Sequence, residues 1–172
     1  MIAYHTQMRA GFEADRWRLM VYDRKTSTTR NLTEPFDRNV DEIAWSPDSK
    51  TIYFTAGDVP QNPLFALPVA GGAPRKVADG HLTQLSISKD GLRAVMAKDS
   101  LSRPADVVTV DLASGRVARL TDTNDAALAG FALLPSESVS YAGALGKTIQ
   151  GWVTKPANFD PAKKYPLLLI VH

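Results

Sequence analysis

Residues 43–55, with the sequence IAWSPDSKTIYFT, carry the clearest structural signal in this chain. Two runs that are rich in β-branched and aromatic residues flank a polar centre, SPDSK. Proline presets φ for the first corner of a turn, and Asp and Ser side chains can bond their own backbone there. The stretch therefore predicts a β-hairpin that reverses at residues 46–50.

The same pattern returns 42 residues later. Residues 85–96, with the sequence LSISKDGLRAVM, place Asp90 where the first hairpin has Asp48. Gly91 follows and can adopt the positive φ that a tight turn requires. Short strands that repeat every 40–45 residues or so, roughly one blade per repeat, are typical of a β-propeller.

A third pass along the chain is in phase with the first. Segments that end at Asp23 and Asp111 lie 88 residues apart, and so do Thr33 and Thr121. We therefore predict a mainly β fold, with a partial β-propeller of about two to three four-stranded blades over residues 1–125. Aromatic residues of the repeats are interpreted as packing between strands: Trp45, Tyr53, Phe54 and Phe65.

Composition limits the classes of function. The chain has 172 residues and a net charge of +2, and no run of basic residues suggests a phosphate-binding surface for nucleic acid. It contains no cysteine, which excludes disulfides and thiolate metal sites. No apolar run is long enough to cross a membrane, and the first residues lack the features of a signal peptide. We expect a soluble parent protein in the cytoplasm, the periplasm or the secreted fraction.

The pattern changes after about residue 125. Residues 137–141 and 148–154 alternate as two strands around a turn at 143–147. Residues 167–171, LLLIV, form a continuous apolar run of the kind found in a strand that is buried on both faces. Residues 126–172 are therefore predicted to begin a second domain, in which helices cover a sheet.

The order of these segments carries a resemblance to a known family. The repeats are followed by TIQGW at 148–152, by Pro156, and by KYPLLLIVH at 164–172. This succession resembles the prolyl oligopeptidase family of serine peptidases, in its acylaminoacyl-peptidase and dipeptidyl-peptidase-like branch. The resemblance implies that a propeller limits access of short peptides to an α/β-hydrolase domain, whose truncated start is residues 126–172. It implies no cofactor and no metal.

The resemblance also implies where the chemistry lies. The family nucleophile sits in a Gly-x-Ser-x-Gly turn, which this chain lacks, so the Ser, Asp and His of the triad are expected beyond residue 172. The chain by itself is then an inactive fragment with no catalytic residues. His172 matches the first residue of the family's His-Gly-Gly-Pro loop, which implies a role at the oxyanion loop. The alternative is a purely structural residue at the end of a strand.

Charged residues surround Gly11 and Phe12 in the link between two predicted strands: Arg9, Glu13, Asp15 and Arg16. Relatives with aminopeptidase-like activity hold the ammonium group of a peptide with propeller carboxylates, so the resemblance implies substrate contact here. The alternative is a set of ordinary salt bridges between strands. His5 and His81 have no partner at metal-ligand spacing and are interpreted as structural or exposed.

Two other functions stay open. The first is a self-standing propeller that binds proteins, like the Tol-associated periplasmic propellers, which have similar repeats. The second is an esterase without peptidase activity. Residues 148–172 favour the peptidase, because a binding propeller has no reason to end in an entry strand of a hydrolase. Two to three blades leave open strand edges, so we expect this chain to associate or to be partly disordered when isolated.

Overall fold

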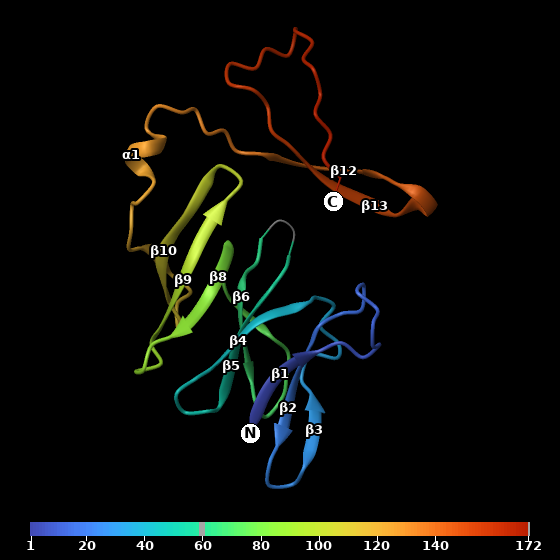
Figure 1. Ribbon diagram of the computed structural model, residues 1–172, viewed down its shortest axis with the longest axis vertical. Coiled ribbons are helices and arrows are strands. Elements are labelled where there is room, and N and C mark those ends of the chain that lie inside the picture. Colours follow the sequence, from blue (N-terminus) through green and yellow to red (C-terminus); the bar gives the residue numbers. More distant parts are fainter. Residues whose placement is uncertain (59–60, 172) are drawn as a thin grey trace. The chain divides into compact units, whose positions relative to one another are not determined.

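The computed structural model describes residues 1–58 and 61–171 (Figure 1). The chain divides into two compact units, Met1–Ala127 and Leu128–His172.

Three antiparallel sheets make up the first unit. The first sheet has the order β1-β2-β3, the second β4-β5-β6-β7 and the third β8-β9-β10-β11, so each strand pairs with its neighbour along the chain. The bounds are β1 (Ile2–Thr6), β2 (Arg18–Asp23), β3 (Thr28–Asn31), β4 (Val40–Trp45), β5 (Thr51–Ala56), β6 (Leu64–Pro68), β7 (Arg75–Ala78), β8 (His81–Ile87), β9 (Arg93–Ser100), β10 (Arg103–Asp111) and β11 (Val117–Arg119). The predicted mainly β architecture, with repeated antiparallel sheets, is confirmed.

The two turns that revealed the repeat are held by the same contacts. The Ser46 hydroxyl donates to Oδ1 of Asp48 at 2.6 Å and accepts the N–H of Thr51 at 2.9 Å. Ser88 repeats the first contact, donating to Oδ1 of Asp90 at 2.5 Å. These hydroxyl donors are the main reason why the pKa of each of the two carboxyls lies below its usual value.

The second sheet is buried on both faces, and β6 shows why. Its sequence Leu-Phe-Ala-Leu alternates across the sheet, so that Phe65 and Leu67 enter one apolar cluster while Leu64 and Ala66 enter another. The first cluster joins the first and second sheets, and the second cluster joins the second and third. The predicted packing role of the aromatic residues holds for Phe54 and Phe65, which are buried, and Trp45 and Tyr53 pack against the clusters from partly buried positions.

A single carboxylate also links β4 and β8, the first strands of the second and third sheets. Glu42 in β4 accepts the N–H of Gln84 at 2.7 Å and the N–H of Leu85 at 2.5 Å. The register of β8 shifts between Thr83 and Ser86, and Gln84 has a φ of 59°. The irregular backbone of this β-bulge turns two N–H groups out of the ladder, and the side chain of Glu42 satisfies both.

The second unit has little secondary structure. Helix α1 (Asp125–Leu128) lies at the border of the units, and the hairpin of β12 (Glu137–Ala142) and β13 (Thr148–Val153) encloses the short 3₁₀ turn η1 (Ala144–Gly146). The hairpin predicted for residues 137–154 is therefore confirmed. No described residue after Leu128 is buried.

The strand predicted over residues 167–171 is wrong for this structure, where the segment forms no strand. Its five side chains are 75–86% exposed. A strand exists only through hydrogen bonds to a neighbour, and β12 and β13 pair only with each other. The start of a hydrolase domain in residues 126–172 thus stays a prediction.

Candidate functional site

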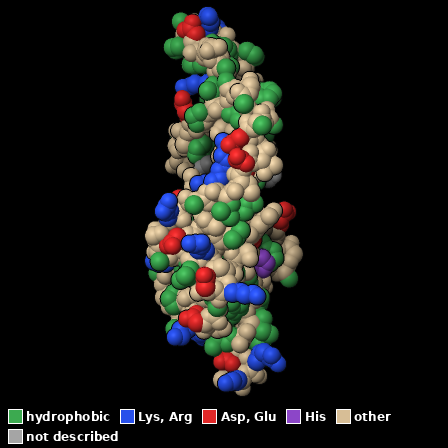
Figure 2. Space-filling view, turned by 90° about the vertical axis from the view of Figure 1, so that its left-hand side faces the viewer, with side chains coloured by type: hydrophobic (Ala, Val, Ile, Leu, Met, Phe, Trp, Pro, Cys, Tyr) green, Lys and Arg blue, Asp and Glu red, His purple; other side chains and the backbone are tan. Residues whose placement is uncertain are grey.

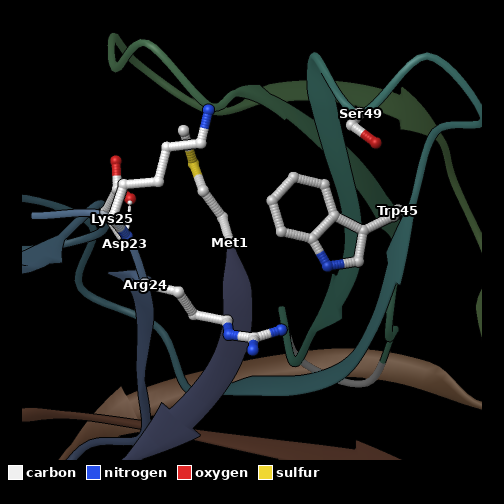
Figure 3. Close-up of a pocket in the computed structure, with 6 residues that line it drawn as sticks. All are labelled: Met1, Asp23, Arg24, Lys25, Trp45 and Ser49. Atoms are coloured by element: carbon white, nitrogen blue, oxygen red, sulfur yellow. Dashed lines mark hydrogen bonds between the residues drawn. The ribbon is translucent and has the colours of Figure 1, made fainter. Parts of the chain in front are cut away.

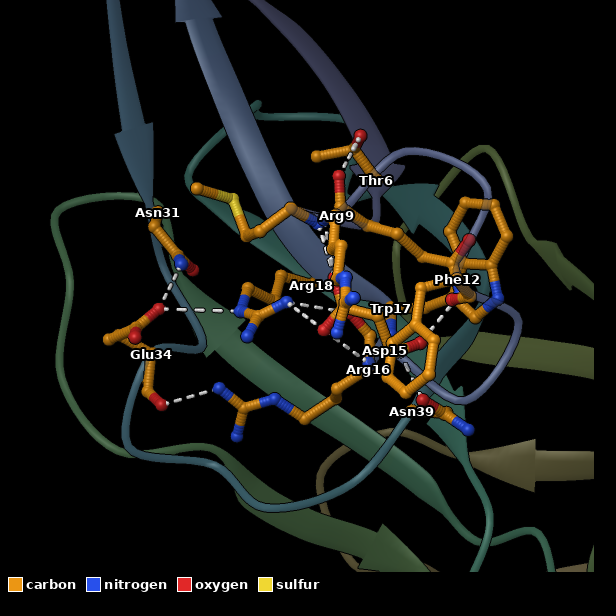
Figure 4. Close-up of polar contacts among 12 residues, drawn as sticks. Thr6, Arg9, Phe12, Asp15, Arg16, Trp17, Arg18, Asn31, Glu34 and Asn39 are labelled. Carbon is orange, nitrogen blue, oxygen red and sulfur yellow. Dashed lines mark hydrogen bonds and ion pairs between the residues drawn. The ribbon is translucent and has the colours of Figure 1, made fainter.

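The most elaborate connection in the first unit is residues 7–17, between β1 and β2. The equivalent connection in the third sheet consists of residues 101–102 alone, between β9 and β10. A two-residue turn suffices to join these strands, so the extra residues of the first connection are not needed to build the sheet. This loop holds all four residues that the sequence singled out for substrate contact, and Figure 4 labels three of them, Arg9, Asp15 and Arg16.

Asp15 closes the loop. Its Oδ2 accepts the N–H of Met8 at 2.6 Å and the N–H of Arg9 at 2.8 Å, while its Oδ1 accepts the N–H of Arg16 at 2.8 Å. The guanidinium of Arg18 donates to the same Oδ1 at 3.1 Å. These donors, above all the N–H of Arg9, lower the pKa of Asp15 to about 2. With its acceptor sites filled from within the chain, this carboxylate is a structural group of the loop.

Arg16 links the base of the loop, through hydrogen bonds, to the connection between β3 and β4. Its guanidinium donates to the carbonyl oxygen of Phe36 at 2.5 Å and to that of Glu34 at 2.8 Å. The carboxylate of Asp37 lies 4.0 Å from the same group. Figure 4 shows the side chain reaching toward Glu34. For Asp15 and Arg16, the alternative of internal polar contacts is the one that the geometry supports.

Arg9 and Glu13 differ from the other two, because both are exposed at the tip of the loop. The Arg9 guanidinium carbon lies 4.5 Å from the centre of the Phe12 ring, which is a cation–π contact. Among the described residues, neither this guanidinium nor the Glu13 carboxylate has a hydrogen bond or ion pair. The loop therefore presents one cation and one anion that can meet a ligand.

Sequence reasoning missed Gln7, which fills the inside of the loop. Its side-chain amide donates to three carbonyl oxygens, at 3.3 Å to Phe12, 3.2 Å to Glu13 and 2.6 Å to Asp15. A glutamine beside a glycine-containing link carries no signal of such a role in a single sequence. Only the folded loop brings these carbonyl groups together.

Other residues considered for function lie elsewhere. His172 falls outside the described residues. His5 lies at the end of β1, with Nδ1 3.1 Å from the carbonyl oxygen of Val40, and His81 contacts Asp99 on the neighbouring strand. In the described part of the chain, no three His, Cys, Asp or Glu side chains gather as a metal site would require.

An open hollow of about 830 Å³ lies at the opposite end of the strands, beside the β2–β3 and β4–β5 turns (Figure 3). Its lining includes Arg24, Lys25 and Trp45, and none of the four predicted residues. On the face in Figure 2, basic and acidic side chains are interspersed, without a large patch of one sign. No helix in the described residues is long and apolar enough to span a membrane.

Comparison with known proteins shows what the chain resembles. No family model matches the chain. The present chain is 32% identical to dipeptidyl-peptidase 5 of Porphyromonas gingivalis. The match covers 98% of the present chain and 25% of the Porphyromonas protein. The predicted resemblance to the prolyl oligopeptidase family is confirmed. The chain spans about a quarter of the length of this relative and of similar fungal proteins named dipeptidyl-peptidase 5.

Solved structures show the shared fold. An acylaminoacyl peptidase in complex with Z-Gly-Gly-Phe-chloromethyl ketone superposes on 94% of this chain with a TM-score of 0.75, at 18% identity and over 24% of the peptidase chain. TolB from Acinetobacter baumannii matches 69% of this chain with a TM-score of 0.55, at 17% identity and over 29% of the TolB chain. The acylaminoacyl peptidase thus shares more of its fold with this chain than TolB does.

Proposed function

We propose that this chain is part of a serine peptidase of the prolyl oligopeptidase family, which hydrolyses short peptides by acyl transfer. The observation that carries the proposal is the similarity to dipeptidyl-peptidase 5 along nearly the whole chain. In the intact enzyme the propeller would restrict entry to short or unfolded peptides. The nucleophile, base and orienting acid would be supplied by residues after His172, since no Gly-x-Ser-x-Gly turn occurs here.

The exposed tip of residues 7–17 is the proposed point of contact with substrate. Glu13 would bind the ammonium group of an unblocked peptide, because its carboxylate has no partner among the described residues and stands on a fixed loop. An ion pair of this kind orients the peptide before the chemical step. Asp15 and Arg16 are not part of the proposed contact, since their polar atoms already form hydrogen bonds within the chain.

Two experiments test the proposal at different levels. Sequencing the DNA that follows the codon for His172 should reveal an in-frame Gly-Gly-Pro and a later Gly-x-Ser-x-Gly. The longer product should hydrolyse an unblocked dipeptide anilide, while the 172-residue chain should not. A stop codon directly after His172 would instead favour a binding propeller.

The loop is tested in the longer enzyme with the same peptide in unblocked and N-acetylated forms. Glu13→Gln should raise KM for the unblocked peptide and leave KM for the acetylated one unchanged. Asp122→Asn, an exposed carboxylate near the end of the first unit, is the matched control. Equal effects of Glu13→Gln on the two peptides would refute the ammonium contact.

The second candidate is a propeller that binds proteins, and the match to TolB over 69% of the chain favours it. Residues 128–171 argue against it, because the acylaminoacyl peptidase match extends over 94% of the chain. A binding propeller would keep its affinity for a partner after removal of residues 128–172.

A further inference from the structure

Residues 18 and 106 occupy the same place in the first and third sheets, 88 residues apart. The N–H of Leu19 donates to the Thr33 hydroxyl at 2.9 Å, and the N–H of Val107 donates to the Thr121 hydroxyl at the same distance. These two contacts fix the correspondence residue by residue. Position 15 therefore corresponds to position 103.

The two corners carry the same ion pair with its charges exchanged. In the first sheet Asp15 pairs with Arg18 at 3.1 Å, and in the third sheet Arg103 pairs with Asp106 at 3.5 Å. Two residues three positions apart can form this ion pair whichever of them carries the positive charge. The exchange places the carboxylate beside the loop in the first sheet and the guanidinium beside the two-residue turn in the third.

The order of charges matters because the long loop directs two N–H groups at this position. Met8 and Arg9 direct their N–H groups at position 15, and a carboxylate can accept both, whereas a guanidinium has no acceptor atom. Gln7 completes the arrangement, because its amide donates to the carbonyl oxygens of Phe12, Glu13 and Asp15.

We propose that Asp15 and Gln7 are positioning residues, which hold the loop closed so that Arg9 and Glu13 are presented to peptide in a fixed geometry. The proposal rests on the proposed function of the same loop. Asp15 fixes Arg9 through the backbone N–H of that residue, and Gln7 fixes Glu13 through its carbonyl oxygen. A loop ordered before binding loses less conformational entropy when the peptide arrives.

The first test is amide hydrogen exchange on the 172-residue chain. Asp15→Asn and, separately, Gln7→Ala should accelerate exchange at Met8 and Arg9 by about tenfold or more, since local opening governs exchange there. Asp106→Asn is the matched control, because it removes the carboxylate of the equivalent corner without touching the loop. Unchanged exchange at Met8 and Arg9 in both loop variants would overturn the proposal.

The second test separates positioning from general stability through kinetics of the longer enzyme. Asp15→Asn and Gln7→Ala should raise KM for the unblocked peptide with little change in kcat, and Asp106→Asn should leave KM unchanged. Positioning is refuted if Asp15→Asn and Gln7→Ala open the loop without changing KM, while Glu13→Gln does raise KM. In that case the proposed function stands. If Glu13→Gln also leaves KM unchanged, the proposed function itself fails, and accelerated exchange would show a loop clamp with no role in peptide binding.

Discussion

The two units of the chain differ in how their apolar residues are used. In the first unit, Phe54, Leu64 and Leu82 are completely buried. In the second, Leu167 and Ile170 are more than four-fifths exposed. The strands that hold these buried residues and residues 167–171 are all rich in apolar side chains, so composition does not explain the difference in burial. The first unit stacks sheets on both faces of its middle sheet, while the second offers a single hairpin that has nothing to cover it.

The largest effect that the comparison predicts is at Phe54. Its ring stacks on Phe65 at 5.4 Å and meets the edge of Phe36 at 5.7 Å. Phe54→Ala should lower the free energy of unfolding by about 3–5 kcal/mol through the lost burial and the cavity. Phe159→Ala, whose ring lies tilted beside Tyr165 in the second unit, should change it by less than about 0.5 kcal/mol. Urea unfolding measures both, and similar losses would contradict the comparison.

A glycine in each unit gives a sharper contrast of backbone packing. Gly115 has a φ of 75°, and a Cβ at this position would lie 2.1 Å from the carbonyl oxygen of Val77. Gly115→Ala should therefore cost about 1–3 kcal/mol of the free energy of unfolding. Gly130→Ala in the second unit meets nothing within 4 Å and should be neutral or slightly stabilising. Thermal denaturation of both variants measures the contrast between these two positions, and equal losses would contradict it.

Acid should weaken the first unit through its two repeated turns. The pKa values of Asp48 and Asp90 are lowered in the folded chain, so the ionised carboxyls stabilise it above the ordinary value of 3.8. This stabilisation is lost as the pH falls below that value toward the folded-state pKa. Asp48→Asn combined with Asp90→Asn should flatten the dependence of unfolding on pH in that range. A pH profile as steep as that of the unmodified chain would show that the turns contribute nothing.

The smallest effect on stability is expected in the exposed segment of residues 167–171. Leu169, which is 75% exposed, should be replaceable by Lys with less than about 0.5 kcal/mol change in the free energy of unfolding. Self-association should decrease, because an exposed apolar run favours contact between chains. Analytical ultracentrifugation of Leu169→Lys and the unmodified chain tests this, with Lys164→Leu as a reverse control. A destabilised but equally associated variant would show that the segment is packed within its own chain.

Sequence alone predicted the first unit well, because its information is local. The turns at Asp48 and Asp90 are defined by residues within five positions, and their spacing gives the repeat. The conformation of residues 167–171 could not be predicted in the same way, since an apolar run becomes a strand only when another strand lies beside it. The sequence places the charged residues at 9–16 in one link, but it could not show which of them bond within the chain and which are exposed. Asp15 differs from Glu13 only through donors that folding brings together.

The contact between Glu42 and the β-bulge at Gln84 and Leu85 also bears on how the chain folds. Pairing within each sheet joins strands that follow one another, so these hairpins can form within microseconds. The Glu42 contacts span 42 and 43 residues and require closure of a much longer loop. We therefore expect docking of the second sheet on the third to follow formation of the hairpins. A contact that forms after the rate-limiting step changes the lifetime of the native state and leaves the refolding rate almost unchanged, and this is the result that we expect when Glu42 is replaced.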